Sequence, residues 1–141
     1  MRIIGLNFNK ISAQKYREID GEIKINSNLE FEDIKEDNIP IFGSDVLVFS
    51  FKNNLNYDPK IGSVDFEGKI VVLIEKEDKI TKKEIIKAWE KKEINNGIRV
   101  SLLNFIMIKI NIQALQLEEQ LGLPYHLPMP RLDIKTKEED F

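Results

Sequence analysis

The chain contains no cysteine, which excludes disulfide bonds, thiolate metal sites and cysteine nucleophiles. Its seven glycines are isolated from one another, and no glycine-rich phosphate-binding loop is present. Neither charge dominates, because 21 basic and 24 acidic residues give a net charge of -3. The chain therefore lacks the basic field that attracts a phosphate backbone, and we do not expect a nucleic-acid-binding protein.

Long uncharged apolar runs are also missing. The longest apolar stretch, 98–112, is interrupted by Arg99 and Lys109, so we expect no membrane span. The first ten residues lack the apolar core and small-residue cleavage site of a signal peptide, and we expect a cytoplasmic protein. A chain of 141 residues with 42% hydrophobic and 32% charged residues is typical of one folded domain.

Alternating apolar and polar residues predict two strands in the first third of the chain. The residues expected on their buried faces are Ile4, Leu6 and Phe8 in the first, and Ile23, Ile25, Leu29 and Phe31 in the second. The next segment, 31–45, contains Pro40 and Gly43 and is predicted to be a loop.

Two longer alternating runs follow, Val46 to Tyr57 and Ile61 to Glu75, joined by a turn at Pro59. They predict a long antiparallel hairpin. Gly68 stands where the second run should have an apolar side chain, which predicts a bulge or a close backbone approach. Together the four runs predict an antiparallel meander sheet with one buried face.

Helical patterns occupy the second half of the chain. Thr81 and Glu84 form a capping box before a short helix with an apolar stripe that includes Trp89, which we expect to pack in the core. A long helix follows and ends at Gly122. The stripe expected to face the sheet is Val100, Leu103, Met107, Ile110, Ala114, Leu117 and Leu121. The fold class is therefore α+β, with a single domain over 1–132 and a charged tail, 133–141, that we expect to be flexible.

The long helix is apolar around most of its circumference. The residues expected to point away from the sheet are Leu102, Phe105, Ile106 and Ile112. Because a helix that is apolar all round is buried all round, they predict the subunit interface of a homo-oligomer, with a dimer as the simplest closed arrangement.

A proline-bearing strip, Leu123 to Leu132, follows the long helix. Its three prolines forbid a helix, so we expect an extended segment that packs through Leu127 and Met129 on the protein's own sheet or long helix. Two interpretations remain open. The strip is either an arm that covers part of the core, or the wall or lid of an apolar groove.

No residues in the sequence predict catalysis or metal binding. The single histidine, His126, has no metal-ligand or catalytic partner at a recognisable spacing, and we expect it to be satisfied or exposed to solvent. The acidic clusters lack the spacing of a calcium loop. We therefore expect no cofactor, no metal and no enzymatic activity.

The order of these elements resembles the SecB-type export chaperone family and its archaeal and toxin-associated relatives. Two stretches carry the resemblance: "VLVFSFKNNLNYDPKIGSVDFEGKIVVLIEK" for the paired long strands, and "LLNFIMIKINIQALQLEEQLGLPYHLPMPRL" for the long helix and its connecting loop. The family's members are oligomers, including tetramers, that hold unfolded chains in apolar grooves. By position, the resemblance implies a peptide-binding role for Phe49, Phe51, Tyr125, Leu127 and Met129. The family has a further helix after the connector, whereas only segment 133–141 follows here.

Two functions remain open at this point. The first is a SecB-like holdase that binds extended or unfolded polypeptides without nucleotide. The alternative is a non-catalytic interaction or scaffold subunit whose apolar surfaces are only structural. An exposed apolar patch favours the first, whereas burial of Tyr125, Leu127 and Met129 in their own chain favours the second.

Overall fold

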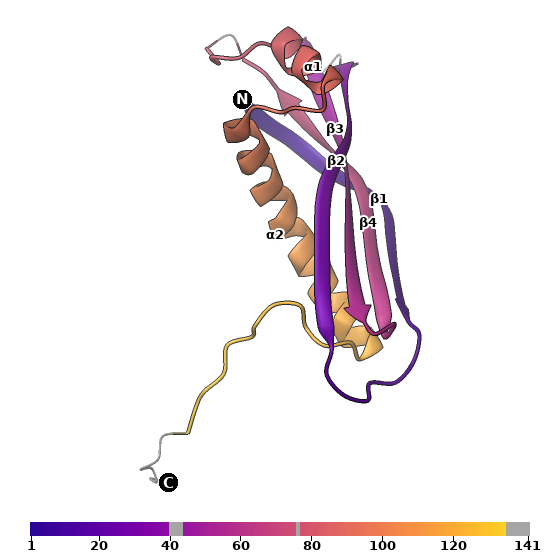
Figure 1. Cartoon of the computed structure of the whole chain (residues 1–141). Coiled ribbons are helices and arrows are strands. Elements are labelled where there is room, and N and C mark those ends of the chain that lie inside the picture. The colour runs from indigo at the N-terminus through magenta and orange to yellow at the C-terminus, as the bar shows by residue number, and fades with distance from the viewer. Residues whose placement is uncertain (40–43, 76, 135–141) are drawn as a thin grey trace.

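A computed structural model of the chain describes residues 1–39, 44–75 and 77–134, and Figure 1 shows its elements. A four-stranded antiparallel sheet is followed by two helices, which confirms the α+β fold class. The elements are β1 (Arg2–Lys15), β2 (Lys24–Ile39), β3 (Ser44–Asp58), β4 (Gly62–Leu73), α1 (Lys82–Glu90) and α2 (Asn96–Leu121). Of the charged tail, segment 135–141 lies outside the described residues.

The order of strands in the sheet is β1-β4-β3-β2. Strands β2, β3 and β4 form the predicted consecutive hairpins, but β1 pairs with β4 and not with β2, so a simple meander was the wrong prediction. Pairing with β4 brings Phe8 against Phe51 and Phe66, at ring-centroid distances of 6.0 and 5.5 Å. The alternating pattern predicts that β1 is a strand, but it does not predict which strand β1 pairs with. In the structure β1 pairs with β4, and this pairing packs Phe8 against aromatic rings of the core.

Strand β2 continues through residues 31–39, which the sequence predicted as a loop. A register shift between Phe31 and Asp33 places one extra residue in β2. Because the side-chain period in a strand is two, this bulge interrupts the apolar alternation and brings Ile34, not Asp33, into the core. Pro40 and Gly43 lie outside the described residues.

The predicted antiparallel hairpin of β3 and β4 is present, and it contributes most of the buried face of the sheet. A close backbone approach occurs at Gly68, where a Cβ atom would lie 2.4 Å from the Asn7 carbonyl oxygen and 2.7 Å from Cζ of Phe51. Strand β1 also bulges opposite this point, between Phe8 and Lys10. Of the two alternatives predicted from Gly68, the close backbone approach is therefore present, and the bulge lies in the neighbouring strand.

Helix α2 packs on the sheet through a face that overlaps the predicted one in part, because Ile110 and Ala114 are buried and Leu103, Leu117 and Leu121 are partly buried. The buried row is Ile98, Leu102, Ile106, Ile110, Ala114 and Glu118. Val100 and Met107, which the sequence placed against the sheet, are about half exposed. Four-residue steps turn gradually around a helix, so this row fits a helix that crosses the strands obliquely, as Figure 1 shows. When a helix is apolar around most of its circumference, its sequence alone does not show which face packs on the sheet.

This result also corrects the predicted oligomer interface. Leu102 and Ile106 are completely buried in their own chain, and Phe105 is partly buried. Ile112 remains exposed, and so do Val100, Met107 and Ile108.

Helix α2 is long and apolar enough to cross a membrane. The core helix of a soluble protein can have the same length and composition, so this property does not indicate a membrane span.

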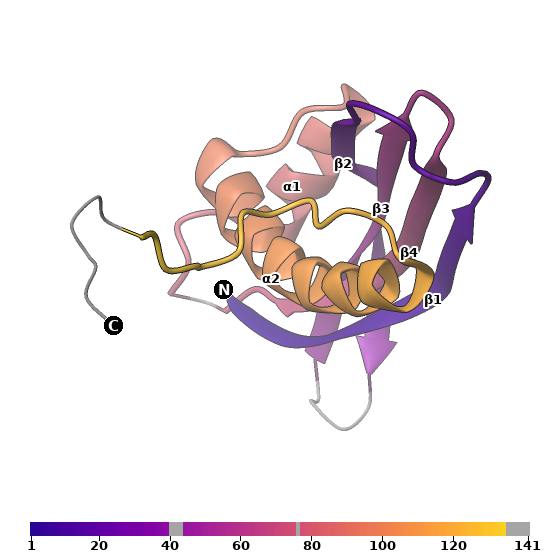
Figure 2. The same ribbon diagram turned by 90° about the horizontal axis from the view of Figure 1, so that it is seen from below.

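The two helices cover different parts of the sheet. Helix α2 contacts β1 and β4, whereas α1 contacts β2. Figure 2 shows α2 lying across one face of the sheet, with the C-terminal segment leaving from its end. Helix α1 and the loop that joins the two helices therefore lie beside β2.

Candidate functional site

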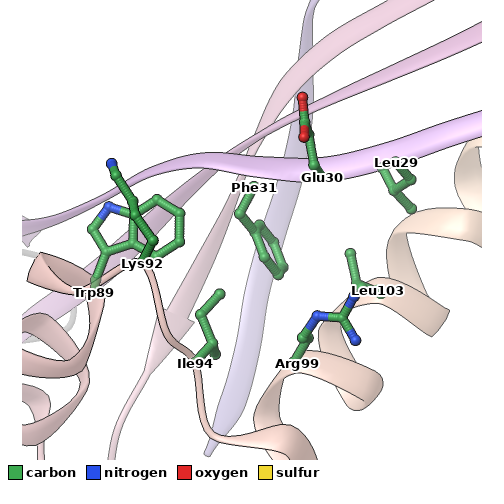
Figure 3. Close-up of a pocket in the computed structure, with 8 residues that line it drawn as sticks. All are labelled: Leu29, Glu30, Phe31, Trp89, Lys92, Ile94, Arg99 and Leu103. Carbon is green, nitrogen blue, oxygen red and sulfur yellow. The ribbon is translucent and has the colours of Figure 1, made fainter.

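A groove of about 330 Å³ lies between β2 and the helices (Figure 3). Leu29 and Phe31 line it from β2, and Trp89 lines it from the end of α1. Ile94, from the loop between the helices, and Leu103, on α2, complete its apolar lining. All five side chains also pack against the core, so the groove is an extension of the core that opens to solvent.

Charged side chains frame this groove. Lys92 and Arg99 line it together with Glu30, which points away from Phe31 on the other side of β2 in Figure 3. The Lys92 ammonium nitrogen lies 4.6 Å from the centroid of the Trp89 ring, a cation–π contact that holds one cation at the rim. The groove therefore combines an apolar floor with a mainly basic rim.

Strand β2 has a free outer edge along this groove. It is the last strand in the sheet, and within the described part of the chain only β3 pairs with it. An edge strand presents unpaired backbone N–H and C=O groups to any extended chain beside it. The groove can thus offer apolar contacts from its floor and hydrogen bonds from its wall.

The predicted peptide-binding residues do not lie together. Phe49 and Phe51 are 0% and 1% exposed, and the Phe31 ring covers Phe49 at a centroid distance of 5.4 Å. They support the groove from beneath and cannot touch a bound chain while the core is closed. Tyr125 and Met129 lie at the far end of α2, beside Leu115 in a separate shallow pocket.

Sequence reasoning missed the residues that line the groove, because Leu29, Phe31 and Trp89 were all expected in the core. One signal was available, since tryptophan is enriched at binding hot spots and Trp89 is the only tryptophan. The assembly of this site depends on the position of the loop between the helices, which no local pattern specifies.

The C-terminal strip is not helical, as predicted, bends at His126 and Leu127, and begins with two anchors. Leu123 is buried, with its methyl groups against Gly62. The His126 backbone N–H donates to the Glu118 carboxylate over 3.1 Å. Beyond this point Leu127 and Met129 are 37% and 50% exposed, so the prediction that they anchor the strip is only partly right.

A buried polar cluster holds the base of this strip. The Glu118 carboxylate is completely buried and accepts hydrogen bonds from the Tyr57 hydroxyl and the His126 backbone N–H. His126 Nδ1 lies 3.0 Å from both carboxylate oxygens, and its Nε2 lies 2.9 Å from Oδ1 of Asn111. Both ring nitrogens therefore have internal partners, which makes this histidine a satisfied structural residue, as the sequence predicted.

This cluster also perturbs the Tyr57 hydroxyl. Burial, and then the hydrogen bond to the Glu118 carboxylate, raise the pKa of Tyr57 well above its usual range. A phenol that stays neutral is a permanent donor to the buried carboxylate. Among the residues that the structure describes, no group of three or more His, Asp or Glu side chains could hold a metal ion.

Compared with known proteins, the chain matches no protein-family model and no curated protein. It does match the solved structure of the SecB-like chaperone Rv1957 of Mycobacterium tuberculosis, in complex with a ChAD peptide from the antitoxin HigA1 (Rv1956). The match covers 94% of this chain and 89% of that chain, with a TM-score of 0.58 and 16% sequence identity. At this identity the likeness shows the fold alone, and the chain therefore has a SecB-like fold.

Proposed function

We propose that this protein is a holdase, which binds extended apolar stretches of unfolded polypeptide in the groove between β2 and the helices, without nucleotide. The observation that carries the proposal is the groove itself, in which the apolar side chains of Phe31, Trp89 and Leu103 line an opening beside a free strand edge. Extended chains suit such a site because main-chain hydrogen bonds give affinity and apolar contacts give selectivity.

The fold supports this proposal at a coarser level, because the SecB-like chaperone with the same fold was solved with a peptide bound. The alternative, a purely structural subunit, requires Tyr125, Leu127 and Met129 to be buried in their own chain. They are 42%, 37% and 50% exposed, which favours a protein with open binding surfaces.

The basic rim adds a preference among clients. Lys92 and Arg99 favour an apolar segment with acidic residues nearby, because opposite charges attract and like charges repel at the edge of an apolar site. We therefore expect stronger binding of apolar segments flanked by Asp or Glu than of the same segments flanked by Lys.

The test uses Trp89 as an internal reporter, since it is the only tryptophan and it lines the groove. Titration with a reduced and alkylated, permanently unfolded protein should shift the Trp89 emission. Stoichiometric amounts of the holdase should also suppress aggregation of a chemically unfolded client.

A double variant, Ile94→Ser with Leu103→Ser, should bind the unfolded protein at least about tenfold more weakly, because each lost apolar contact removes part of about 1.5–3 kcal/mol. Ile11→Ser is the matched control, since Ile11 is an exposed isoleucine on β1, at the opposite edge of the sheet. Equal binding by the parent and the folded double variant would refute the proposal.

A further inference from the structure

The three prolines of the C-terminal arm (Leu123–Ile134) all stand at even-numbered positions, 124, 128 and 130. In an extended strand the N–H and C=O groups of every second residue point to the same edge. The missing N–H groups of these prolines therefore all fall on one edge of the arm. The opposite edge keeps the complete backbone groups of Tyr125, Leu127 and Met129.

The same three residues share one face of the arm. Side chains alternate between the two faces of a strand, so Tyr125, Leu127 and Met129 project together. An extended arm thus has one edge able to form hydrogen bonds, one edge blocked by proline, and one apolar face. These are the properties of a strand that is added at the edge of a sheet, where proline is tolerated on the side facing solvent.

The arm does not make this contact within its own chain. Its apolar side chains from Tyr125 onward are exposed, and Leu132 is 99% exposed. The free edge of β2 and the apolar groove beside it are unoccupied by the described residues of the same chain. One chain therefore carries two complementary surfaces, both of which are partly exposed.

We propose that the arm of one chain adds as an edge strand to β2 of a second copy, with Leu127 and Met129 pointing into the groove lined by Trp89. Because the copies are identical, the exchange is reciprocal and makes two such contacts around a twofold axis. The Glu118–His126 contacts fix the base of each arm.

This proposal rests on the proposed function, because the arm occupies the site that unfolded clients would use. The exchanged arm is a built-in competitor that shields the groove when no client is present. A client binds by displacing it, and the anchors at Glu118 keep the displaced arm attached to its own chain.

A synthetic peptide of residues 123–134 tests the pairing edge. It should shift the Trp89 emission, and a methyl group on the Leu127 backbone nitrogen should weaken binding at least about tenfold by removing a donor from the pairing edge. The matched control is a methyl group on the Leu132 nitrogen, which falls on the proline edge and should leave binding unchanged. Equal effects of the two methyl groups, or no shift with the parent peptide, would overturn the proposal.

Cysteine variants test whether the partner is a second copy, on a background that is free of cysteine. A mixture of the Ile94→Cys and Leu127→Cys chains should form a disulfide-linked heterodimer on mild oxidation. Leu132→Cys in place of Leu127→Cys should form much less. A disulfide formed only within a single chain that carries both changes would overturn exchange between copies.

The two proposals fail separately. If an unfolded client shifts the Trp89 emission but the arm peptide does not, the groove binds clients and the arm is not its ligand. If neither shifts it, both proposals fail.

Discussion

Tyr57 at the end of β3 donates a hydrogen bond from its hydroxyl to Glu118 on the last turn of α2, across 61 residues of sequence. This contact joins the sheet, the long helix and the arm, because Glu118 also accepts the His126 backbone N–H. A buried carboxylate is tolerated only where donors surround it, and here they come from both sides of the core.

Tyr57→Phe should therefore lower the free energy of unfolding by about 1–3 kcal/mol, because it leaves the buried carboxylate with one donor fewer. Urea unfolding of the parent and the variant measures this difference. Tyr16→Phe is the control, since Tyr16 is 53% exposed and its hydroxyl shares a hydrogen bond with the Ser63 hydroxyl near the surface. A change for Tyr57→Phe as small as that for Tyr16→Phe would contradict the prediction.

The raised pKa of Tyr57 predicts a loss of stability in alkali. A tyrosine in the unfolded chain ionises near pH 10. Because the folded state favours the neutral phenol, its contribution is complete below that pH and declines as the pH rises towards the pKa of the folded state. The difference in unfolding free energy between the parent and Tyr57→Phe should thus be constant below about pH 9 and shrink above about pH 10. A difference that grows in alkali would show the opposite linkage.

Gly68→Ala should destabilise the sheet by about 1–3 kcal/mol, because the new Cβ would meet the Asn7 carbonyl oxygen at 2.4 Å and the Phe51 ring at 2.7 Å. Gly5→Ala is the matched control, since nothing lies within 4 Å of the corresponding Cβ position. Thermal unfolding of both variants tests the prediction, and equal melting temperatures would contradict it.

The outer face of α2 should mediate a further contact between chains. Val100, Met107, Ile108 and Ile112 remain exposed along it, and each apolar side chain buried there would contribute about 1.5–3 kcal/mol. Replacing Ile108 and Ile112 with glutamate should lower the molar mass measured by light scattering. Gln116→Glu adds charge at an exposed polar position of the same helix and should not. A monomeric parent protein would exclude this contact.

Several features follow from the sequence because they depend on neighbouring residues. The alternation in β3 and β4 predicts the core row that includes Phe49 and Phe66, both of which are buried. Thr81 caps α1 by accepting the Glu84 backbone N–H, and Gly122 ends α2 in the left-handed conformation. The strand alternation and the two helix caps each depend on only a few neighbouring residues. The spacing of apolar residues and the local backbone chemistry are therefore sufficient to predict them.

The pairing of β1, the buried face of α2 and the groove were decided by the tertiary structure, because these features depend on residues far apart in the chain. The sequence by itself determined an α+β chain with a long apolar helix and a proline-bearing C-terminal segment that is not helical. Only packing selected β4 as the neighbour of β1, and Leu102 over Leu103 as a fully buried residue of α2. Tertiary packing also forms the groove, since Phe31, Trp89 and Leu103 come together only when the helices pack on the sheet. Each of these choices is made by burial and shape complementarity between distant elements, which no local period encodes.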